Sequence, residues 1–568
     1  MDKSFIPWAF LDEYRGKIFN GEWPTLPEMF RISVMRFGER PCFTIYEPDR
    51  ISLNYNESLK LIEAVARWLH SKGIKFGDKV AVTGKNSPEW AIAYLGILFA
   101  GAVVVPIDSQ IRIEDTDLLL KTSGAKILFI DEDKYSYYAN RHGDIKEVIS
   151  LKKGIGKYIY ELDGPEAEIE QAKEQDLAAI LFTSGTTGTP KGAMLTHHNF
   201  VSDCYLAQAT PLHLYCTDVF YAILPIHHAY TMLAVFIETI SVGAELLCGK
   251  KMVTAVMLKE LREGKVTMLL GVPMLFNKLL AGILRGVKAK GKLVYGLIKI
   301  LFGISGLIKK VFRINLGKKM FHSVLDKASL ATIRICICGG GPLSPSVFRK
   351  FNQMGIDFVQ GYGLTETSPI ITLNPIEHYK ETSVGKVLVQ TDIKIMDPDE
   401  RGIGEVIVKG PMVMKGYYEL PEETKNAFTP DGYLKTGDLG YLDNENYLYL
   451  TGRAKNVIVT EGGKNVYPEE IENEFQLYDE IDQILIRGFE KDKKLKIEGI
   501  EALVYPSPDF FKNESGAKVS KKEIEARINA IIFETNQKLL PYQKINQTVI
   551  LDEPMEMTTT KKIKRGAV

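Results

Sequence analysis

A segment rich in glycine and hydroxyl side chains, residues 181–200, has the composition of a phosphate-binding loop. It reads LFTSGTTGTPKGAMLTHHNF, so an apolar, strand-like run leads directly into it. Glycines let the backbone approach an anion, hydroxyl groups donate hydrogen bonds, and Lys191 adds a mobile positive charge. A flexible polar linker is the alternative, but it would not explain the repeated Thr and Gly after a strand. We predict that phosphate is bound by Thr183, Ser184, Gly185, Thr186, Thr187, Gly188 and Lys191. Of these residues, Thr183 and Lys191 are also predicted to be catalytic.

The spacing of this loop excludes one large class of nucleotide-binding proteins. In a Walker A loop, the first glycine is followed by any four residues and then by Gly, Lys and either Ser or Thr. In this chain Gly185 is followed, after four residues, by Pro190. The segment is therefore not the loop of a P-loop kinase or GTPase.

Five more motifs follow the loop along the chain. They are GGGPLS (339–344), QGYGLTETS (360–368), TGDLGYLD (436–443), GRAKNVIVTEGGKNVYPEEIE (452–472) and TTTKKIKR (558–565). With the loop, this series resembles the adenylate-forming superfamily, which includes acyl-CoA synthetases, peptide-synthetase adenylation domains and luciferases. The resemblance implies that the chain uses ATP and Mg²⁺ to convert a carboxylic acid into an acyl-adenylate, and then transfers the acyl group to coenzyme A.

The resemblance also implies a nucleotide pocket. Tyr362 would stack on adenine, Asp438 would accept hydrogen bonds from both ribose hydroxyls, and Arg453 would contact ribose and phosphate. Glu366 would hold Mg²⁺, a hard cation that prefers oxygen ligands. Taken singly, these residues could be a turn aspartate, a surface ion pair and a helix cap, but the ordered series of motifs favours a site. The other implied contacts are Gly340, Gly341, Pro342, Gly361, Gly363 and Thr365.

A lysine near the end of the printed sequence would act in the first half-reaction. In the family, a lysine just before an aliphatic residue reaches the reacting carboxylate and the α-phosphate, which indicates Lys562 here. Positive charge is needed because two anions meet during this attack. The family usually has Gly before this lysine, whereas this chain has Lys561. Lys561 therefore remains an alternative, as does a basic tail that only contacts solvent.

The same resemblance implies that a C-terminal domain rotates between the two half-reactions. Lys455, two residues after Arg453, would be the hinge, although many relatives have Asp there and an exposed loop lysine is the alternative. The rotation would withdraw the catalytic lysine and bring the loop that starts at Glu461 to the thiol tunnel. Coenzyme A is then expected to contact Gly462, Gly463 and Lys464.

Three apolar segments are expected to line the pocket for the acid. They are residues 224–236 (LPIHHAYTMLAVF), 271–276 (GVPMLF) and 339–341. The resemblance places His228 at the entrance of this pocket and assigns Gly271 and Val272 to its lining. The alternative for His227 and His228 is a histidine pair without any ligand role. No Asp lies where amino-acid-activating domains use one to hold an α-ammonium group. The sequence therefore favours a fatty acid, and a long chain over a medium one.

Residues 286–313 lie outside these motifs and combine many apolar residues with almost only positive charges. Read as one helix, the segment places Gly303 and Gly306 on the same face as its cations, and no uncharged run approaches the ~20 residues that cross a bilayer. The cations within about 60° of arc are Lys288, Lys292, Lys299, Lys310 and Arg313. Two interpretations remain: a helix lying on an anionic membrane, or a helix pair packed on the enzyme's own core beside the acyl tunnel.

The elements that position these residues follow from the pattern of apolar runs. Strand-like runs alternate with helical stretches, at residues 79–82, 102–107 and 125–130 and again at 219–224, 244–248, 266–270 and 333–338. This alternation predicts parallel βαβ units in two similar α/β subdomains. Short alternating strands from Thr391 predict a small β-rich subdomain. We therefore predict an α/β fold with an adenylation domain of residues 1–453 and a small mobile α+β domain of residues 456–568.

Charge and cysteine content limit the partners and the location. The 568 residues include 71 basic and 71 acidic side chains, so no global field favours nucleic acid. Six scattered cysteines without CxxC spacing predict free, buried thiols in a reducing compartment. The first seventeen residues lack the continuous apolar core of a secretory signal. We expect a cytoplasmic enzyme whose partners are fatty acid, ATP and coenzyme A, with a peripheral position at a membrane left open and the oligomeric state unknown.

Two other functions are compatible with most of these motifs. A fatty acyl-AMP ligase or acyl-carrier-protein synthetase shares the first half-reaction but delivers the acyl group to a carrier-protein thiol. A catalytically silent nucleotide-binding or fatty-acid-binding protein belongs to a different class. Such a protein would be expected to lose the catalytic lysine or the Mg²⁺ carboxylate, whereas this chain retains both Lys562 and Glu366.

Overall fold

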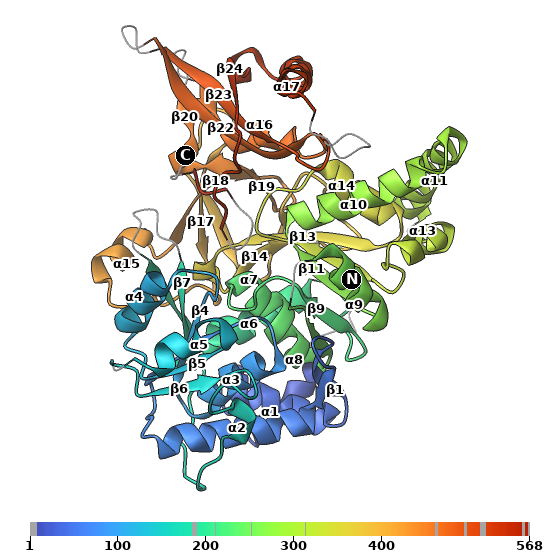
Figure 1. Ribbon diagram of the computed structural model, residues 1–568. Coiled ribbons are helices and arrows are strands. Elements are labelled where there is room, and N and C mark those ends of the chain that lie inside the picture. Colours follow the sequence, from blue (N-terminus) through green and yellow to red (C-terminus); the bar gives the residue numbers. More distant parts are fainter. Residues whose placement is uncertain are drawn as a thin grey trace.

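The first series of predicted strands forms a six-stranded sheet in the computed structural model, which describes residues 8–141, 143–183, 190–210, 212–250, 253–312, 314–459, 464–492, 497–511, 519–558 and 563–565. The strands are β3 (Lys79–Thr83), β4 (Val103–Ile107), β5 (Ile127–Ile130), β6 (Glu147–Ser150), β7 (Leu177–Thr183) and β8 (Lys191–Thr196). Their order is β6-β5-β3-β4-β7-β8, parallel except for the last pair. The intervening helices are α3 (Pro88–Phe99), α4 (Ile113–Ser123) and α5 (Glu132–Ala139). The predicted βαβ pattern is thus confirmed here (Figure 1).

The second series belongs to a thirteen-stranded sheet. Its mainly parallel half contains β1 (Pro41–Ile45), β2 (Ile51–Asn54), β9 (Val219–Ala222), β10 (Glu245–Cys248), β11 (Met268–Gly271), β12 (Ile335–Cys338) and β13 (Asp357–Gly363). Its antiparallel half contains β14 (Ile370–Leu373), β15 (Gly385–Val387), β16 (Asp392–Met396), β17 (Gly404–Lys409), β18 (Leu434–Leu442) and β19 (Tyr447–Arg453). The antiparallel part begins at β14, earlier than Thr391, and continues the parallel sheet through the β13–β14 pair.

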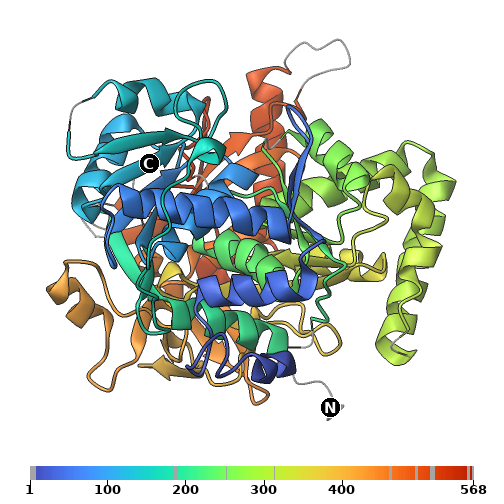
Figure 2. The ribbon, with the colours of Figure 1, turned by 90° about the horizontal axis from the view of Figure 1, so that it is seen from below.

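Helices cover both sheets and fill the space between them. They include α1 (Leu26–Phe37), α2 (Tyr55–Ser71), α6 (His197–Ala209), α9 (Thr254–Glu263), α12 (Gly317–Met320), α13 (His322–Lys327), α14 (Pro345–Gln353) and α15 (Pro421–Ala427). In the view from below, the blue helices α1 and α2 lie across this side of the body (Figure 2). Every residue of α3 is buried, which places this helix at the centre of the core.

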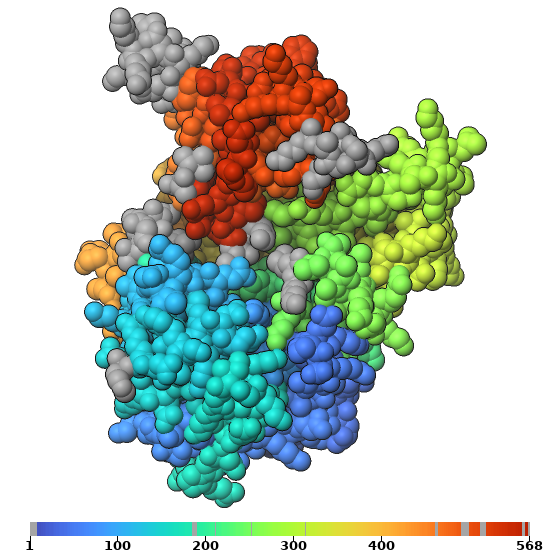
Figure 3. All heavy atoms as spheres, in the orientation of Figure 1, coloured from blue at the N-terminus to red at the C-terminus, as the bar shows by residue number. Residues whose placement is uncertain are grey.

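The residues after β19 form a smaller unit with its own apolar core. It contains the hairpin β20 (Ile458–Val459) and β21 (Asn465–Val466), the helices α16 (Pro468–Asn473) and α17 (Lys521–Asn536), and the sheet β22 (Ile481–Asp492), β23 (Ile497–Pro506) and β24 (Gln547–Ile550). Ile486, Val504 and Ile528 are among its buried residues. This unit sits on top of the body (Figures 1 and 3). The predicted boundaries at Arg453 and Asn456, and the mobility of this unit, stay predictions.

Residues 286–313 do not form one continuous helix, as one of the two interpretations assumed, but belong to two helices, as the other assumed. The chain forms α10 (Pro273–Lys288) and then α11 (Lys292–Phe312), separated by Gly291 with φ of 102°. This left-handed conformation suits glycine, and it prevents α10 and α11 from forming one continuous helix. Lys288 therefore lies on a different helix from Lys292, and Arg313 lies outside the described residues. In the part of the chain that the structure describes, no helix combines the length and apolarity needed to span a membrane.

The prediction of free thiols is confirmed, whereas the prediction of burial holds for five of the six cysteines. All six are free, five of them are buried, and Cys216 is half-buried. Burial raises the pKa of thiols such as Cys42 and Cys338, because a thiolate would lose its hydration in the core.

A buried carboxylate makes the stability of this fold depend on pH. Glu238 begins α8 (Glu238–Val242), which continues α7 (Ala229–Thr231) and the π-helical stretch η3 (Met232–Ile237). Its Oε2 accepts hydrogen bonds from Gln208 Nε2 at 2.6 Å and Ser241 Oγ at 3.2 Å, and its Oε1 has no hydrogen-bond partner among the described residues. Burial raises the pKa of Glu238 to about 8 from a usual 4.5.

Replacing Glu238 with glutamine is therefore expected to stabilise the protein at alkaline pH. Between pH 4.5 and about 8 the folded state keeps a proton that the unfolded chain releases, so stability falls as the pH rises through this range. Relative to wild type, the variant should gain roughly 1 to 3 kcal/mol in free energy of unfolding between pH 5 and pH 8. Urea unfolding at both pH values measures this gain, with the exposed Glu422→Gln as the control. An equal difference at both pH values would show that Glu238 does not titrate in this range.

Candidate active site

The predicted phosphate loop joins the two antiparallel strands β7 and β8. Thr183 ends β7 and is paired with Lys191, which begins β8, and Thr183 Oγ1 donates a hydrogen bond to the Lys191 carbonyl at 3.4 Å. Both ends of the loop are thus held by the hairpin. The loop residues predicted to contact phosphate lie outside the described residues: Ser184, Gly185, Thr186, Thr187 and Gly188.

Lys191 is linked to the predicted Mg²⁺ carboxylate through a tyrosine. Its Nζ forms an ion pair with Glu423 and lies 5.4 Å from the centre of the Tyr417 ring. Tyr417 Oη donates a hydrogen bond to Glu366 Oε1 at 2.9 Å. Burial and the neighbouring Glu366 raise the pKa of Tyr417, so its hydroxyl keeps the proton that it donates. The structure therefore brings the loop lysine and Glu366 into one polar cluster with Tyr417 and Glu423.

Motif spacing did not indicate Tyr417 or Glu423, because both lie more than 200 residues after the loop. The segment that carries Tyr417 is attached to β8 by three backbone hydrogen bonds. They run from Met194 N to Gly416 O at 3.0 Å, from Lys415 N to Met194 O at 3.0 Å, and from Tyr418 N to Gly192 O at 2.8 Å. Asn199 Nδ2 also donates to Pro411 O at 2.7 Å and to Val413 O at 3.0 Å, upstream in the same segment. The end of the loop motif, HHNF, thus has a positioning role.

The residues predicted to bind the nucleoside meet in one cluster. Asp438 on β18 and Arg453 on β19 are partners in the strand register, and Arg453 Nε lies 2.8 Å from Asp438 Oδ1. Tyr362 Oη donates a hydrogen bond to Asp438 Oδ2 at 2.7 Å. Burial and the Asp438 carboxylate raise the pKa of Tyr362, so the phenol stays protonated. Asp438 is 6% exposed, and both of its oxygens have a partner in the protein.

The glycines of two motifs allow close approaches of the backbone. A Cβ at Gly363 would lie 1.5 Å from the carbonyl oxygen of Pro369, so a larger residue would displace the strand. Gly340 has φ of 79°, and a Cβ there would lie 3.6 Å from Val272. Thr365 and Glu366 follow in the short helix η4 (Thr365–Thr367). The predicted adenine-binding segment therefore lies against the start of α10. Its other predicted contacts, Gly341, Pro342 and Gly361, belong to the same two motifs.

The three segments expected to line the acyl pocket converge on Tyr230. Its Oη donates hydrogen bonds to Ile337 O at 2.9 Å and to Gly271 O at 3.4 Å. A Cβ at Gly339 would lie 3.0 Å from the Tyr230 ring. The segments at 224–236, 271–276 and 339–341 are thus neighbours in space, as expected. The individual role of Tyr230 was not predicted, since the spacing of its segment gave no reason to single it out.

His228 directly precedes α7, the helix that carries Tyr230. The ring centres of His227 and His228 are 4.2 Å apart, and His227 Nε2 lies 3.6 Å from Asp108 Oδ2. These three side chains could hold a metal ion, because one ligand atom from each lies within 4.8 Å of the others. Two imidazoles do not suit Mg²⁺, which prefers oxygen ligands. The cluster therefore does not replace Glu366 as the candidate Mg²⁺ ligand.

A buried asparagine fixes the loop in front of His228. Asn86 Nδ2 donates to the carbonyls of Ala222 and Leu224, both at 2.8 Å, and Asn86 Oδ1 accepts from Ile226 N at 3.0 Å. Asn86 precedes α3 in the other sheet system, so it ties the two α/β subdomains together at the predicted acyl pocket. Only the folded arrangement indicates this role.

Lys455, the predicted hinge, lies in the short helix η5 (Ala454–Asn456) between β19 and the C-terminal unit. Burial, and then the Arg453 charge, lowers the pKa of Lys455. Lys464 lies directly before β21, in the same unit. Gly462, Gly463, Lys561 and Lys562 lie outside the described residues, so the predicted coenzyme A and catalytic-lysine contacts remain predictions.

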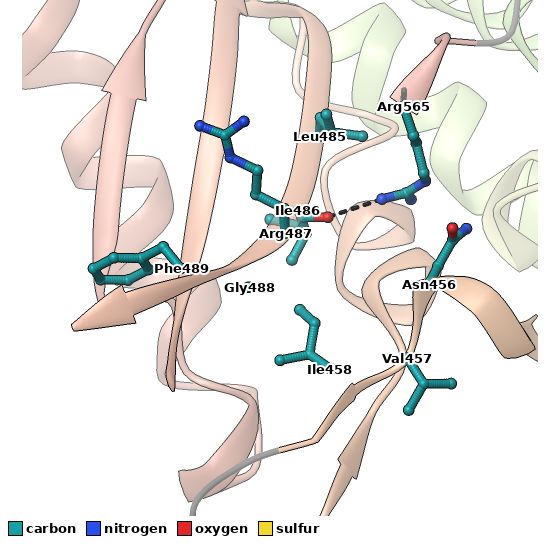
Figure 4. Close-up of a pocket in the computed structure, with 9 residues that line it drawn as sticks. All are labelled: Asn456, Val457, Ile458, Leu485, Ile486, Arg487, Gly488, Phe489 and Arg565. Carbon is teal, nitrogen blue, oxygen red and sulfur yellow. Dashed lines mark hydrogen bonds between the residues drawn. The ribbon is translucent and has the colours of Figure 1, made fainter. Parts of the chain in front are cut away.

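A pocket in the C-terminal unit borders the predicted hinge (Figure 4). It is lined by Asn456, Val457, Ile458, Leu485, Ile486, Arg487, Gly488, Phe489 and Arg565. Arg565 Nη1 donates to the Ile486 carbonyl at 2.8 Å, and Arg565 Nη2 lies 2.6 and 2.7 Å from the two Glu472 oxygens. Arg565, three residues beyond Lys562, is therefore anchored to the unit that follows the predicted hinge.

Polar groups connect the C-terminal unit to the body near the glycine motif. Gln476 Nε2 donates to Pro342 O at 2.9 Å, and its Oε1 accepts from Ser344 N at 2.8 Å. Asn277 Nδ2 on α10 donates to the Gln476 carbonyl at 3.5 Å. Polar contacts of this kind can be exchanged for water without exposing an apolar core. They connect the C-terminal unit to the glycine motif of the predicted adenine site.

Comparison with protein families agrees with this fold and with the order of motifs. The model of the family described as AMP-binding enzyme matches residues 30–418, which is well over half of the chain. The chain belongs to this family and thus to the adenylate-forming superfamily. The predicted class, an adenylate-forming acid–CoA ligase that uses ATP, is thereby confirmed at this level.

Several relatives align with most of the chain. A long-chain-fatty-acid–CoA ligase of Bacillus subtilis is 29% identical and covers 92% of each chain. A feruloyl-CoA synthase of an Amycolatopsis species is 27% identical and covers 82% of this chain and 85% of that protein. A long-chain-fatty-acid–acyl-carrier-protein ligase of Arabidopsis thaliana is 25% identical, with 97% and 86% covered. These relatives differ in both acid and acceptor.

Solved structures confirm the predicted fold class. An anthranilate CoA ligase in complex with anthranoyl-AMP superimposes with a TM-score of 0.77 at 18% identity, with 96% of each chain covered. The o-succinylbenzoate coenzyme A synthetase from Bacillus subtilis, in complex with ATP and magnesium, superimposes with a TM-score of 0.73 at 23% identity, with 95% of this chain and 98% of that chain covered.

Proposed function

We propose that this chain is an AMP-forming long-chain fatty acid–CoA ligase. The observation that carries the proposal is the convergence of apolar segments on Tyr230, beside the glycine motif of the predicted adenine site. An acid held there would place its carboxylate near the nucleotide. The Bacillus subtilis relative, which acts on long-chain fatty acids, supports the same substrate class.

The side chains of the site divide the work of the first half-reaction. Asp438 and Arg453 would hold the ribose, Tyr362 the adenine, and Thr183 and Lys191 the phosphates. Glu366 offers the carboxylate oxygens that Mg²⁺ prefers, and the ion, when bound, would offset phosphate charge during attack. Lys562 would stabilise the charge that develops as the carboxylate attacks the α-phosphate. The products of this step are acyl-AMP and pyrophosphate.

The second half-reaction would transfer the acyl group to the thiol of coenzyme A. Gly462, Gly463 and Lys464 are the proposed contacts of coenzyme A, with Lys455 as the hinge of the domain rotation. Free, buried cysteines support a reducing compartment such as the cytoplasm. A carrier-protein thiol is the second candidate acceptor, because the Arabidopsis relative uses one.

A substrate panel tests this proposal directly. Pyrophosphate release is expected to be fastest with saturated fatty acids of long chain, slower with medium chains, and at background level with amino acids. Each buried methylene contributes only about 0.8 kcal/mol, so the preference should rise gradually along the series. Faster release with feruloyl or anthranilate substrates than with any fatty acid would overturn the substrate class. Thioester formation with carrier protein but not with coenzyme A would overturn the acceptor.

A further inference from the structure

An exposed apolar stripe runs along the whole of α11. Its residues recur at steps of four and three, which places them on one face spanning about 80° of arc. They are between 45% and 91% exposed: Leu293, Leu297, Ile300, Ile304, Leu307 and Val311. Helix α11 projects at the edge of the molecule, so this stripe is open to its surroundings (Figures 1 and 3). A contiguous apolar surface of this kind marks an interaction site.

The opposite face of α11 is firmly attached to the body. Phe302 is buried, and Ser305 Oγ donates to the Gln353 carbonyl at 2.6 Å. Lys309 Nζ donates to Asn352 Oδ1 at 2.7 Å and lies 2.8 Å from Asp357 Oδ1. These contacts fix the rotation of the helix about its axis. The apolar stripe therefore cannot turn inward to pack against the core.

Lysines border this stripe. Lys292, Lys299 and Lys310 are exposed and lie on one side of it, about 60° to 80° from its edge. The surrounding chain carries no opposite charge, because residues 264–325 contain twelve Lys and Arg and no Asp or Glu. The surface thus combines an apolar stripe with charge of a single sign. That combination matches an anionic lipid surface, whose headgroups attract cations and whose acyl region accepts apolar side chains.

We infer that α11 is a docking helix that lies in the interface of an anionic bilayer. A second copy of the chain would also cover the stripe, but in a two-fold interface the same lysines would face each other without acidic partners. A lipid surface satisfies both the apolar stripe and the lysines. Docking would bring α10, which packs beside α11 and begins next to the predicted acyl pocket at Val272, close to the lipid. The use of this contact for taking fatty acid from the bilayer rests on the proposed function.

Cosedimentation with vesicles tests the inference without any substrate. Vesicles of phosphatidylcholine mixed with phosphatidylglycerol should bind the protein at low salt and release it at high salt, because salt screens surface charge. Replacing Lys292, Lys299 and Lys310 together with glutamine should weaken this binding about a hundredfold, since each near-surface lysine contributes roughly a fivefold factor. Leu297, Ile300 and Leu307 form a second set, whose replacement with glutamine should lower binding by at least about a hundredfold.

Matched variants separate these effects from general changes of surface. Replacing the exposed Lys60, Lys121 and Lys522 with glutamine removes the same charge elsewhere and should leave binding unchanged. Phe533→Gln removes a side chain that is 67% exposed on α17 and should also have no effect. Since all these residues are at the surface, circular dichroism and pyrophosphate release with a soluble short-chain acid should match wild type.

Two results would overturn the inference. One is a wild-type protein that does not sediment with anionic vesicles at low salt. The other is a wild-type dimer in sedimentation velocity that becomes a monomer when the apolar set is changed, while vesicle binding is absent. Vesicle binding without activity on fatty acids would instead contradict the proposed substrate and leave the docking helix in place.

Discussion

Replacing Lys562 with alanine is expected to slow formation of the acyl-adenylate by about a hundredfold to a thousandfold, while acyl transfer from supplied acyl-AMP to coenzyme A is largely retained. The loss in the first step follows from the two anions that meet there, because removing one preorganised positive donor from such a transition state costs about this much. Transfer should persist because the resemblance implies that the lysine is withdrawn before the thiol attacks. Single-turnover measurements of the two half-reactions check both parts.

Two neighbouring lysines provide the controls. Lys561→Ala decides the register, since it should be close to wild type if Lys562 is catalytic and severely impaired if the register differs by one residue. Lys564 lies two residues after Lys562 and is exposed, and its Nζ lies 3.4 Å from Glu556 Oε2. Lys564→Ala should leave both half-reactions unchanged. Equal losses in both half-reactions for Lys562→Ala would refute a role limited to adenylation.

Replacing Asp438 with alanine is expected to weaken ATP binding by about tenfold to 150-fold. Hydrogen bonds to a charged group contribute roughly 1.5 to 3 kcal/mol, which corresponds to this range of affinity. In the structure the carboxylate is buried and accepts from Tyr362 Oη at 2.7 Å, while Arg453 Nε lies 2.8 Å away. Its loss would also free both neighbouring side chains to move. Calorimetric titration of ATP and its magnesium complex measures the change.

A second aspartate of the same motif is the matched control. Asp443 ends the TGDLGYLD segment, and its Oδ2 is bonded to Lys380 Nζ at 2.7 Å rather than to the nucleoside cluster. Asp443→Ala should lower the stability of the protein slightly, because it removes an ion pair near the surface. It should leave ATP affinity within about twofold of wild type, because Asp443 is bonded to Lys380 and not to the predicted nucleoside site. Unchanged ATP affinity in Asp438→Ala would remove Asp438 from the proposed site.

The sequence indicated the parts of the fold and site that depend on local pattern. Apolar runs such as 102–107 are strands because β-branched residues buried on both faces suit a parallel sheet. The nucleoside cluster was also indicated, since Asp438 and Arg453 belong to motifs with fixed spacing. The sequence left open whether α10 and α11 are one helix or two, because a single glycine at Gly291 weakens a helix without always ending it.

The remaining features depend on contacts between distant parts of the chain. Tyr417 and Glu423 join Lys191 only because their segment pairs with β8. Asn86 holds the loop before His228 from the other α/β subdomain. Neither contact leaves a periodic pattern in the sequence, since each rests on one side chain and on the folded arrangement of two elements. Such positioning residues become visible only in three dimensions.

The contact of Gln476 with the glycine motif would stabilise the present domain arrangement against the rotation that the resemblance implies. The side-chain amide of Gln476 forms hydrogen bonds with two backbone atoms, Pro342 O and Ser344 N, so both bonds must break when the domains turn. Two such bonds contribute about 1 to 3 kcal/mol, which by itself corresponds to a factor of roughly 5 to 150 in favour of this arrangement. Because Pro342 O and Ser344 N are backbone atoms, substitutions of side chains in the motif would leave both hydrogen bonds in place. Gln476 therefore contributes to the resting position of the C-terminal unit, together with contacts such as the hydrogen bond from Arg401 Nη2 to Tyr467 Oη at 3.3 Å.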